Sequence, residues 1–275
     1  MNARYLILPA ALCLLAACGG STKDKGPLPV SYSKPAEGDR TIYGLACDGS
    51  NDSVVVLLPN AGGDPVTFNI LKAMRAHRLY GKPQIGDWLG VLPMETDSTE
   101  AYSVVDLDEV KGTWTYQVMP EMKKRPVSGK APAPVRMTAE QDSMRQEMMN
   151  LYMVPREYGF TLKRHSKATA VGHIQQSSTL SDDSPVEYPE VKNYTGWRPY
   201  NGKLILVRTE NGSGKKPKEV NDTAEFLLMM KDTLVLKFQD GTTIGYHRKG
   251  SAAEANAAAT AAAAKQAEKQ TEELK

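Results

Sequence analysis

The chain has 275 residues with a formal net charge of +2 at pH 7, and 41% of its residues are hydrophobic. This composition is typical of a globular protein with room for one large or two small domains. Because positive and negative charges nearly balance, the composition excludes a nucleic-acid-binding protein that would rely on a large positive charge.

Residues 1–18 predict export and lipid attachment. Arg4 precedes an apolar run over residues 5–15, which is too short to cross roughly 30 Å of hydrocarbon. Leu15-Ala16-Ala17-Cys18 resembles the lipobox of bacterial lipoproteins. The resemblance implies removal of residues 1–17 and acylation of Cys18, with palmitate among the attached chains. An ordinary cleavable signal, or a short anchor with a chance cysteine, is the alternative.

Residues 18–36, with three prolines and flexible glycines, predict a tether. Because two or three acyl chains bind a membrane firmly, we expect membrane lipid as a partner and an outer-membrane location facing the periplasm, with the cell surface as the alternative. Once Cys13 is removed and Cys18 acylated, Cys47 is the only thiol left and no disulfide can form within the chain. We expect Cys47 to be a small buried apolar residue; a reactive or metal-binding thiol is the alternative.

Residues 37–108 predict a small α+β domain, a barrel or sandwich. A turn is expected at residues 60–65, because Gly62-Gly63-Asp64 lacks the spacing of a phosphate-binding loop. The basic side chains of the helix are expected to be solvated, with an anion site as the alternative. The expected strands cover residues 41–47, 53–58, 66–70, 88–94 and 101–107, and the helix covers residues 71–79.

Residues 109–249 predict a second β domain with an insert at 119–155. The insert ends in a helix that begins with a capping box, Thr138 with Gln141, and stops before Pro155. Methionines in this helix, including Met144 and Met148, are expected to pack it onto the β core. A methionine-rich lid over an apolar site is the alternative.

Two hairpins test the strand register. Asn201-Gly202 favours a two-residue turn that sets Trp197 opposite Leu206 and Pro199 opposite Leu204. In the next hairpin, only a three-residue loop over residues 239–241 keeps one face apolar, pairing Leu234 with Tyr246 and Leu236 with Ile244. That loop requires a positive φ at Gly241.

Residues 250–275 form an Ala-rich segment for which we predict a mobile helical tail. It ends in Lys275, as the small murein lipoprotein of enteric bacteria ends in a lysine, and that resemblance leaves attachment to peptidoglycan as the alternative.

Gly112-Thr113-Trp114 resembles the Gly-x-Trp of the first lipocalin strand. The resemblance implies that residues 109–249 form an up-and-down barrel closed at one end by Trp114, with Arg248 packed on its ring. The strand, turn and strand ending at Tyr246-His247-Arg248 resemble the lipocalin-like domains of Bacteroidetes envelope lipoproteins. Such a barrel implies a small apolar ligand. The candidate lining residues are Trp114, Tyr116, Leu206, Leu236 and Phe238, beside the structural residues Gly112, Trp114, Gly241 and Arg248.

Motifs for chemistry are absent from the sequence. His77, His165, His173 and His247 lack metal-ligand spacing, and no nucleophile motif is present. The expected fold is therefore mainly β (α+β), without an enzyme activity, cofactor or metal. The leading hypothesis is a membrane-anchored lipoprotein that binds a small apolar or amphiphilic ligand. The alternative is a structural or interaction lipoprotein, whose β cores are solid and whose partner is another envelope protein.

Overall fold

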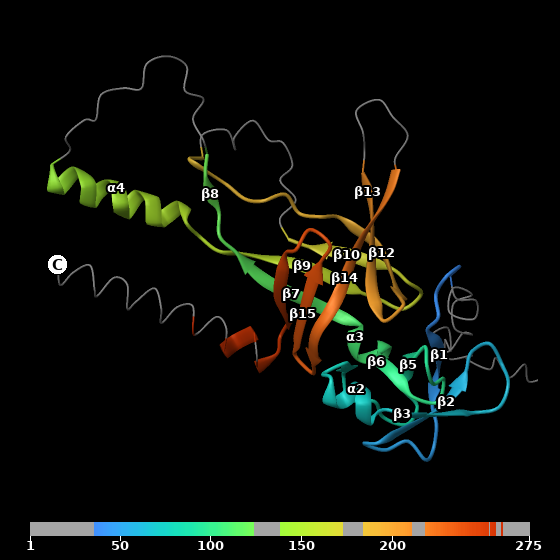
Figure 1. Cartoon of the computed structure of the whole chain (residues 1–275). Coiled ribbons are helices and arrows are strands. Elements are labelled where there is room, and N and C mark those ends of the chain that lie inside the picture. The colour runs from blue at the N-terminus through green and yellow to red at the C-terminus, as the bar shows by residue number, and fades with distance from the viewer. Residues whose placement is uncertain are drawn as a thin grey trace, which may run out of the picture.

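The computed structural model describes residues 36–123, 138–172, 184–210 and 218–252, together with residues 254–256 and 260. Its fold is mainly β, as predicted, and consists of two large sheets that each curl toward a barrel, with a further two-stranded sheet (Figure 1). The export signal, Cys18 and the C-terminal Lys275 lie outside the described residues. None of the helices in the described ranges is both long and apolar enough to span a membrane.

The N-terminal sheet has six strands in the order β3-β2-β1-β5-β6-β4. A parallel bridge between Asn69, the last residue of β3, and Glu100, the residue before β6, brings these two strands together, so the sheet curls into a small barrel. Alternating side chains such as Val55, Leu57 and Phe68 fill the inside, as the period of two along a strand requires. The elements are β1 (Ile42–Ala46), β2 (Val54–Pro59), β3 (Val66–Asn69), α2 (Leu71–Arg75), β4 (Leu79–Tyr80), β5 (Trp88–Pro93) and β6 (Ala101–Asp106).

The second sheet has eight strands in the order β10-β9-β7-β16-β15-β14-β13-β12 and forms a nearly closed antiparallel barrel, here called the large barrel. Its ends meet at the bridge between Lys167 and Gly196. The short helix α3 (Leu107–Val110) leads into it. The strands are β7 (Gly112–Val118), β9 (Arg156–Leu162), β10 (Ala168–Val171), β12 (Tyr194–Tyr200), β13 (Lys203–Glu210), β14 (Lys218–Met230), β15 (Thr233–Phe238) and β16 (Thr243–Arg248).

Both predicted hairpin registers are confirmed. Trp197 lies opposite Leu206 and Pro199 opposite Leu204. In the second hairpin, Leu234 lies opposite Tyr246 and Leu236 opposite Ile244, and Gly241 has a φ of +85°. Turn chemistry and the alternation of apolar side chains are local signals, which explains why both registers can be derived from sequence.

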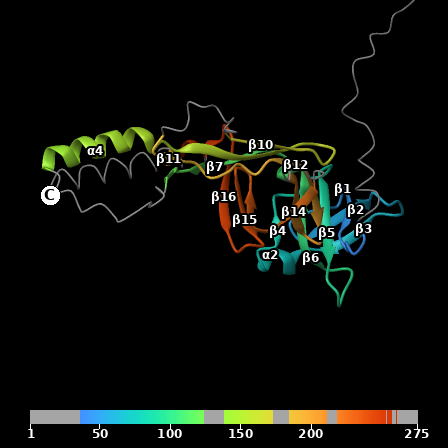
Figure 2. The same cartoon turned by 90° about the horizontal axis from the view of Figure 1, so that it is seen from above.

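The insert contains the short strand β8 (Glu121–Met122) and the helix α4 (Ala139–Tyr152). β8 pairs with β11 (Val186–Glu187), which lies outside the insert. The capping box is confirmed, since the Thr138 backbone N–H donates to Gln141 Oε1 at 3.1 Å and the Gln141 N–H to Thr138 Oγ1 at 3.4 Å. The predicted packing of this helix on the β core is wrong: α4 projects beyond both barrels (Figures 1 and 2), and Met144 is 71% exposed. Helical spacing of methionines does not reveal which surface, if any, they meet.

Two further expectations for the small barrel fail. The helix α2 ends at Arg75 rather than residue 79, because His77 adopts a φ of +54° and Leu79 begins β4. Cys47 is a free, partly exposed cysteine rather than a buried one. It follows the last residue of β1, and its thiol contacts the Leu45 carbonyl oxygen at 3.6 Å.

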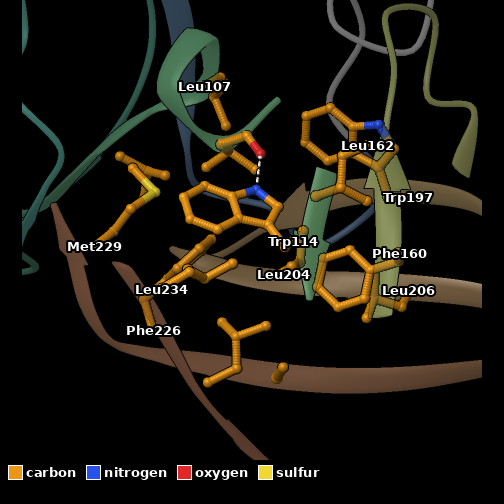
Figure 3. Packing of buried hydrophobic residues seen from close by; sticks show 14 of the residues in the cluster. Leu107, Trp114, Phe160, Leu162, Trp197, Leu204, Leu206, Phe226, Met229 and Leu234 are labelled. Atoms are coloured by element: carbon orange, nitrogen blue, oxygen red, sulfur yellow. Dashed lines mark hydrogen bonds between the residues drawn. The ribbon is translucent and has the colours of Figure 1, made fainter. Parts of the chain in front are cut away.

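One hydrophobic cluster joins the two sheets. It combines Tyr43, Trp88 and Leu107 from the N-terminal part with the inward side chains of the large barrel. Figure 3 shows Leu107 beside Trp114 in this cluster. Residues 38–40 add polar links between the two barrels. The Asn201 backbone N–H donates to Asp39 Oδ1 at 2.9 Å, the Arg40 N–H to Asn201 Oδ1 at 2.8 Å, and Asn201 Nδ2 to the Gly38 carbonyl oxygen at 3.0 Å.

Candidate functional site

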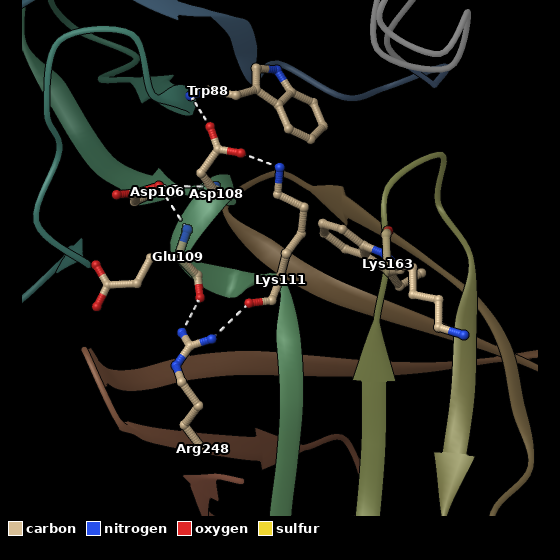
Figure 4. Close-up of polar contacts among 8 residues, drawn as sticks. Trp88, Asp106, Asp108, Glu109, Lys111, Lys163 and Arg248 are labelled. Atoms are coloured by element: carbon tan, nitrogen blue, oxygen red, sulfur yellow. Dashed lines mark hydrogen bonds and ion pairs between the residues drawn. The ribbon is translucent and has the colours of Figure 1, made fainter. Parts of the chain in front are cut away.

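One end of the large barrel is closed by Trp114, which is fully buried. Its indole N–H donates to the Val110 carbonyl oxygen at 2.7 Å. The Arg248 guanidinium lies 4.3 Å from the ring centroid, so the contact expected between these two residues is present. Arg248 also donates to the carbonyl oxygens of Glu109 at 2.7 Å and Lys111 at 2.9 Å (Figure 4). The indole N–H of Trp114 and the guanidinium of Arg248 are therefore both hydrogen-bonded within the fold.

Asp106 begins the helix that supports this closed end. Its Oδ1 accepts from the backbone N–H groups of Asp108 at 2.9 Å and Glu109 at 3.0 Å, as an N-cap does (Figure 4). The residue is 2% exposed. Burial, reinforced by the charges of Asp87 and Glu109, raises the pKa of Asp106 to about 7 despite those hydrogen bonds.

Asp106 also lines a crevice of about 700 Å³ between the small barrel and the large one, together with Lys82, Asp87 and Arg248. Within the described ranges, no group of His, Cys, Asp and Glu side chains is arranged to hold a metal ion. The crevice carboxylates instead accept mainly from backbone N–H groups, as Asp87 does from Gln84 at 2.7 Å. The polar groups of this region thus serve the joint between the barrels.

The other end of the large barrel is open. A cavity of about 200 Å³, here called the aromatic cleft, enters the interior between β7, β9, β15 and β16. Residues 189–192 form part of its rim. Side chains from strands far apart in sequence make its walls: Tyr116, Tyr158, Phe160, Tyr194, Phe238, Ile244 and Tyr246.

The tyrosines of the aromatic cleft differ in their partners. The Tyr194 hydroxyl donates to Asp222 Oδ2 at 3.1 Å. Tyr246 is 3% exposed, and within the part of the chain that the structure describes its hydroxyl makes no hydrogen bond. Burial raises the pKa of both phenols, and Asp222 adds to the effect at Tyr194. Both therefore stay protonated at neutral pH.

The structure separates the predicted lining residues into two groups. Trp114, Leu206 and Leu236 lie in the filled core, whereas Tyr116 and Phe238 line the aromatic cleft. Sequence reasoning missed the other aromatic walls. In Arg156–Leu162, the alternation of Tyr158, Phe160 and Leu162 is the signal that could have identified an inward face.

No protein-family model matches the sequence, and no curated protein matches it. Among solved structures, the chain is similar to a lipocalin-like protein from Bacteroides thetaiotaomicron. The two are 19% identical, the match covers 51% of this chain and 96% of that chain, and the TM-score is 0.27. The assignment of an antiparallel barrel therefore rests on the strand order and register of this chain.

Proposed function

We propose that this protein is a membrane-anchored envelope lipoprotein whose large barrel binds a small apolar or amphiphilic ligand in the aromatic cleft. The observation that carries the proposal is the cleft itself, a concave site with aromatic walls, lined by Tyr246, whose hydroxyl makes no hydrogen bond to a described residue. Ligand sites are commonly mostly apolar with a few placed polar groups. The Leu15-Ala16-Ala17-Cys18 motif supports the anchor. The location that we propose is the periplasmic face of the outer membrane.

The size of the cleft limits the ligand. Sites for drug-sized molecules enclose about 300–1,000 Å³, whereas the aromatic cleft encloses about 200 Å³. A cavity of about 150 Å³ already holds benzene. The ligand is therefore a molecule of one or two rings, or a larger amphiphile of which only one end enters the barrel.

Native mass spectrometry of protein purified from its own envelope tests ligand binding. Ile244 lines the cleft, whereas its neighbour Thr243 is exposed on the outer face of the same strand. We expect a bound small molecule on the wild type and on the Thr243→Trp control. We expect none on Ile244→Trp, because the introduced indole ring fills the cleft. An acylated wild-type protein that is free of any small molecule would count against binding.

The anchor has its own test. The Cys18→Ser variant should leave the membrane fraction, because the remaining chain carries no acyl group. If the variant still sediments with membranes after a high-salt wash, the lipoprotein proposal is wrong.

A structural or interaction lipoprotein is the second candidate, and the filled part of the barrel favours it. Leu204, Leu206 and Leu234 are each at most 1% exposed and belong to the same buried cluster as Trp114 (Figure 3). Under this alternative the aromatic cleft is a shallow end of a solid core, and capture of another envelope protein, with no small molecule bound, would support it.

A further inference from the structure

We infer that the ligand of the aromatic cleft carries a neutral hydrogen-bond acceptor on a flat aromatic body, and that the Tyr246 hydroxyl donates to this acceptor. The inference rests on the proposed function and adds the chemical class of the ligand. Aryl ketones and quinones belong to this class.

The position of Tyr246 is the first argument. It lies opposite Leu234 in the sheet, so its side chain points into the barrel. The Tyr116 ring meets it edge-on with centroids 5.2 Å apart, and the Phe160 ring lies at 4.9 Å. These contacts fix the phenol in place. The Tyr246 hydroxyl makes no hydrogen bond to a described residue, and the cleft that Tyr246 lines is the space from which a partner can reach it.

The direction of the hydrogen bond is the second argument. The Tyr194 proton is already committed to Asp222 at 3.1 Å, whereas the Tyr246 proton has no acceptor among the described residues. Because burial raises the pKa of Tyr246, this phenol keeps its proton and can donate it. The missing partner is therefore an acceptor.

The distribution of charge is the third argument. The charged side chains of the cleft, Glu190, Lys192 and Asp240, belong to its rim segments. Lys192 is also paired with Asp222 at 3.3 Å and lies 5.4 Å from the Phe238 ring. The walls beside Tyr246 are aromatic or aliphatic, and a charged ligand group there would lack a counterion. A neutral acceptor, such as a carbonyl oxygen, avoids that cost. The flat walls favour stacked or edge-on contact with an aromatic body.

A pair of probes with equal shape tests this inference: 2-acetylnaphthalene, which has a carbonyl acceptor, and 2-isopropylnaphthalene, which has none. Binding is measured by equilibrium dialysis on the full chain carrying Cys18→Ser, which avoids loss of the probes into detergent. We expect the ketone to bind about tenfold more tightly than the hydrocarbon, as one well-placed hydrogen bond allows. Tyr246→Phe should abolish this preference and leave the affinity for the hydrocarbon unchanged. The control Tyr102→Phe, at an exposed tyrosine, should keep the preference.

The outcomes separate the two proposals. If neither probe binds, the aromatic cleft is not a site for such ligands and the proposed function fails with the inference. If both probes bind equally well to the wild type, or Tyr246→Phe keeps the tenfold preference, the cleft is a ligand site but the assignment of Tyr246 as donor is overturned.

Discussion

The two ends of the large barrel differ in how their central side chains are hydrogen-bonded. At the closed end, the Trp114 indole N–H and the Arg248 guanidinium donate to backbone carbonyl oxygens. At the open end, Tyr246 is 3% exposed and lines the aromatic cleft, and its hydroxyl makes no hydrogen bond to a described residue. The central polar groups of the closed end are therefore held within the fold, whereas the Tyr246 hydroxyl belongs to the wall of the aromatic cleft.

The largest expected effect is at the closed end. Trp114→Ala should lower the free energy of unfolding by about 3–5 kcal/mol, because it opens a cavity and leaves the Val110 carbonyl and Arg248 without their aromatic partner. Urea denaturation measures the loss. A change below about 1 kcal/mol would show that this end is not the stabilising one.

Gly112→Ala should destabilise the protein by about 2–3 kcal/mol for two reasons. Alanine is strained at the backbone conformation of Gly112, and its side chain would clash with a neighbour. Gly112 has a φ of +133°, and an added Cβ would lie 2.3 Å from Arg248 Nη1. Gly245 is the matched control, because a Cβ there meets nothing within 4 Å. If Gly112→Ala and Gly245→Ala lower the free energy of unfolding equally, the clash with Arg248 does not contribute to the loss at Gly112.

Asp106→Asn should stabilise the protein by about 2 kcal/mol at pH 8 and by almost nothing at pH 4. The pKa of Asp106 rises from 3.8 to about 7 on folding, so the folded state binds more protons than the unfolded state between these values. Wild-type stability from this group is complete below pH 3.8 and is lost as the pH rises through 7.

Asparagine keeps the capping oxygen of Asp106 and has no charge to bury. Urea denaturation of both proteins across this pH range is the measurement. Parallel pH profiles for wild type and Asp106→Asn would mean that Asp106 is not the titrating group.

The smallest effect is expected at the open end. Tyr246→Phe removes a hydroxyl that has no partner in the described residues, so the free energy of unfolding should change by less than about 0.5 kcal/mol. Thermal unfolding without ligand is sufficient to measure it. A loss of 2 kcal/mol would reveal a hydrogen bond of Tyr246 within the protein and would end the contrast between the two ends.

The sequence predicts the closed end better than the open one. Gly112, Trp114 and Arg248 form a recognisable pattern, and the register of β15 with β16 follows from one turn and the alternation of side chains. The aromatic cleft instead combines side chains from β7, β9, β12, β15 and β16, which become neighbours only when the barrel curls. No local signal in the sequence encodes that proximity.

The raised pKa of Asp106 also could not be predicted from the sequence. Its high pKa comes from burial between the two sheets, and that burial depends on how the barrels pack together. Likewise, the exposure of α4 could not be predicted. Apolar residues at helical spacing do not reveal whether another part of the protein packs against them.

The link between residues 38–40 and Asn201 has a mechanical consequence. A pull on the chain ahead of residue 36 would reach Gly38, Asp39 and Arg40 first, and these residues are hydrogen-bonded to the turn between β12 and β13. Asp39 also accepts from the Tyr43 hydroxyl on β1 at 2.6 Å. The force would therefore divide between the large barrel and strand β1 of the small barrel before any strand separates from its sheet. The point where the chain enters the fold would spread a pulling force over both barrels, as the N-terminal lipid anchor proposed above would require.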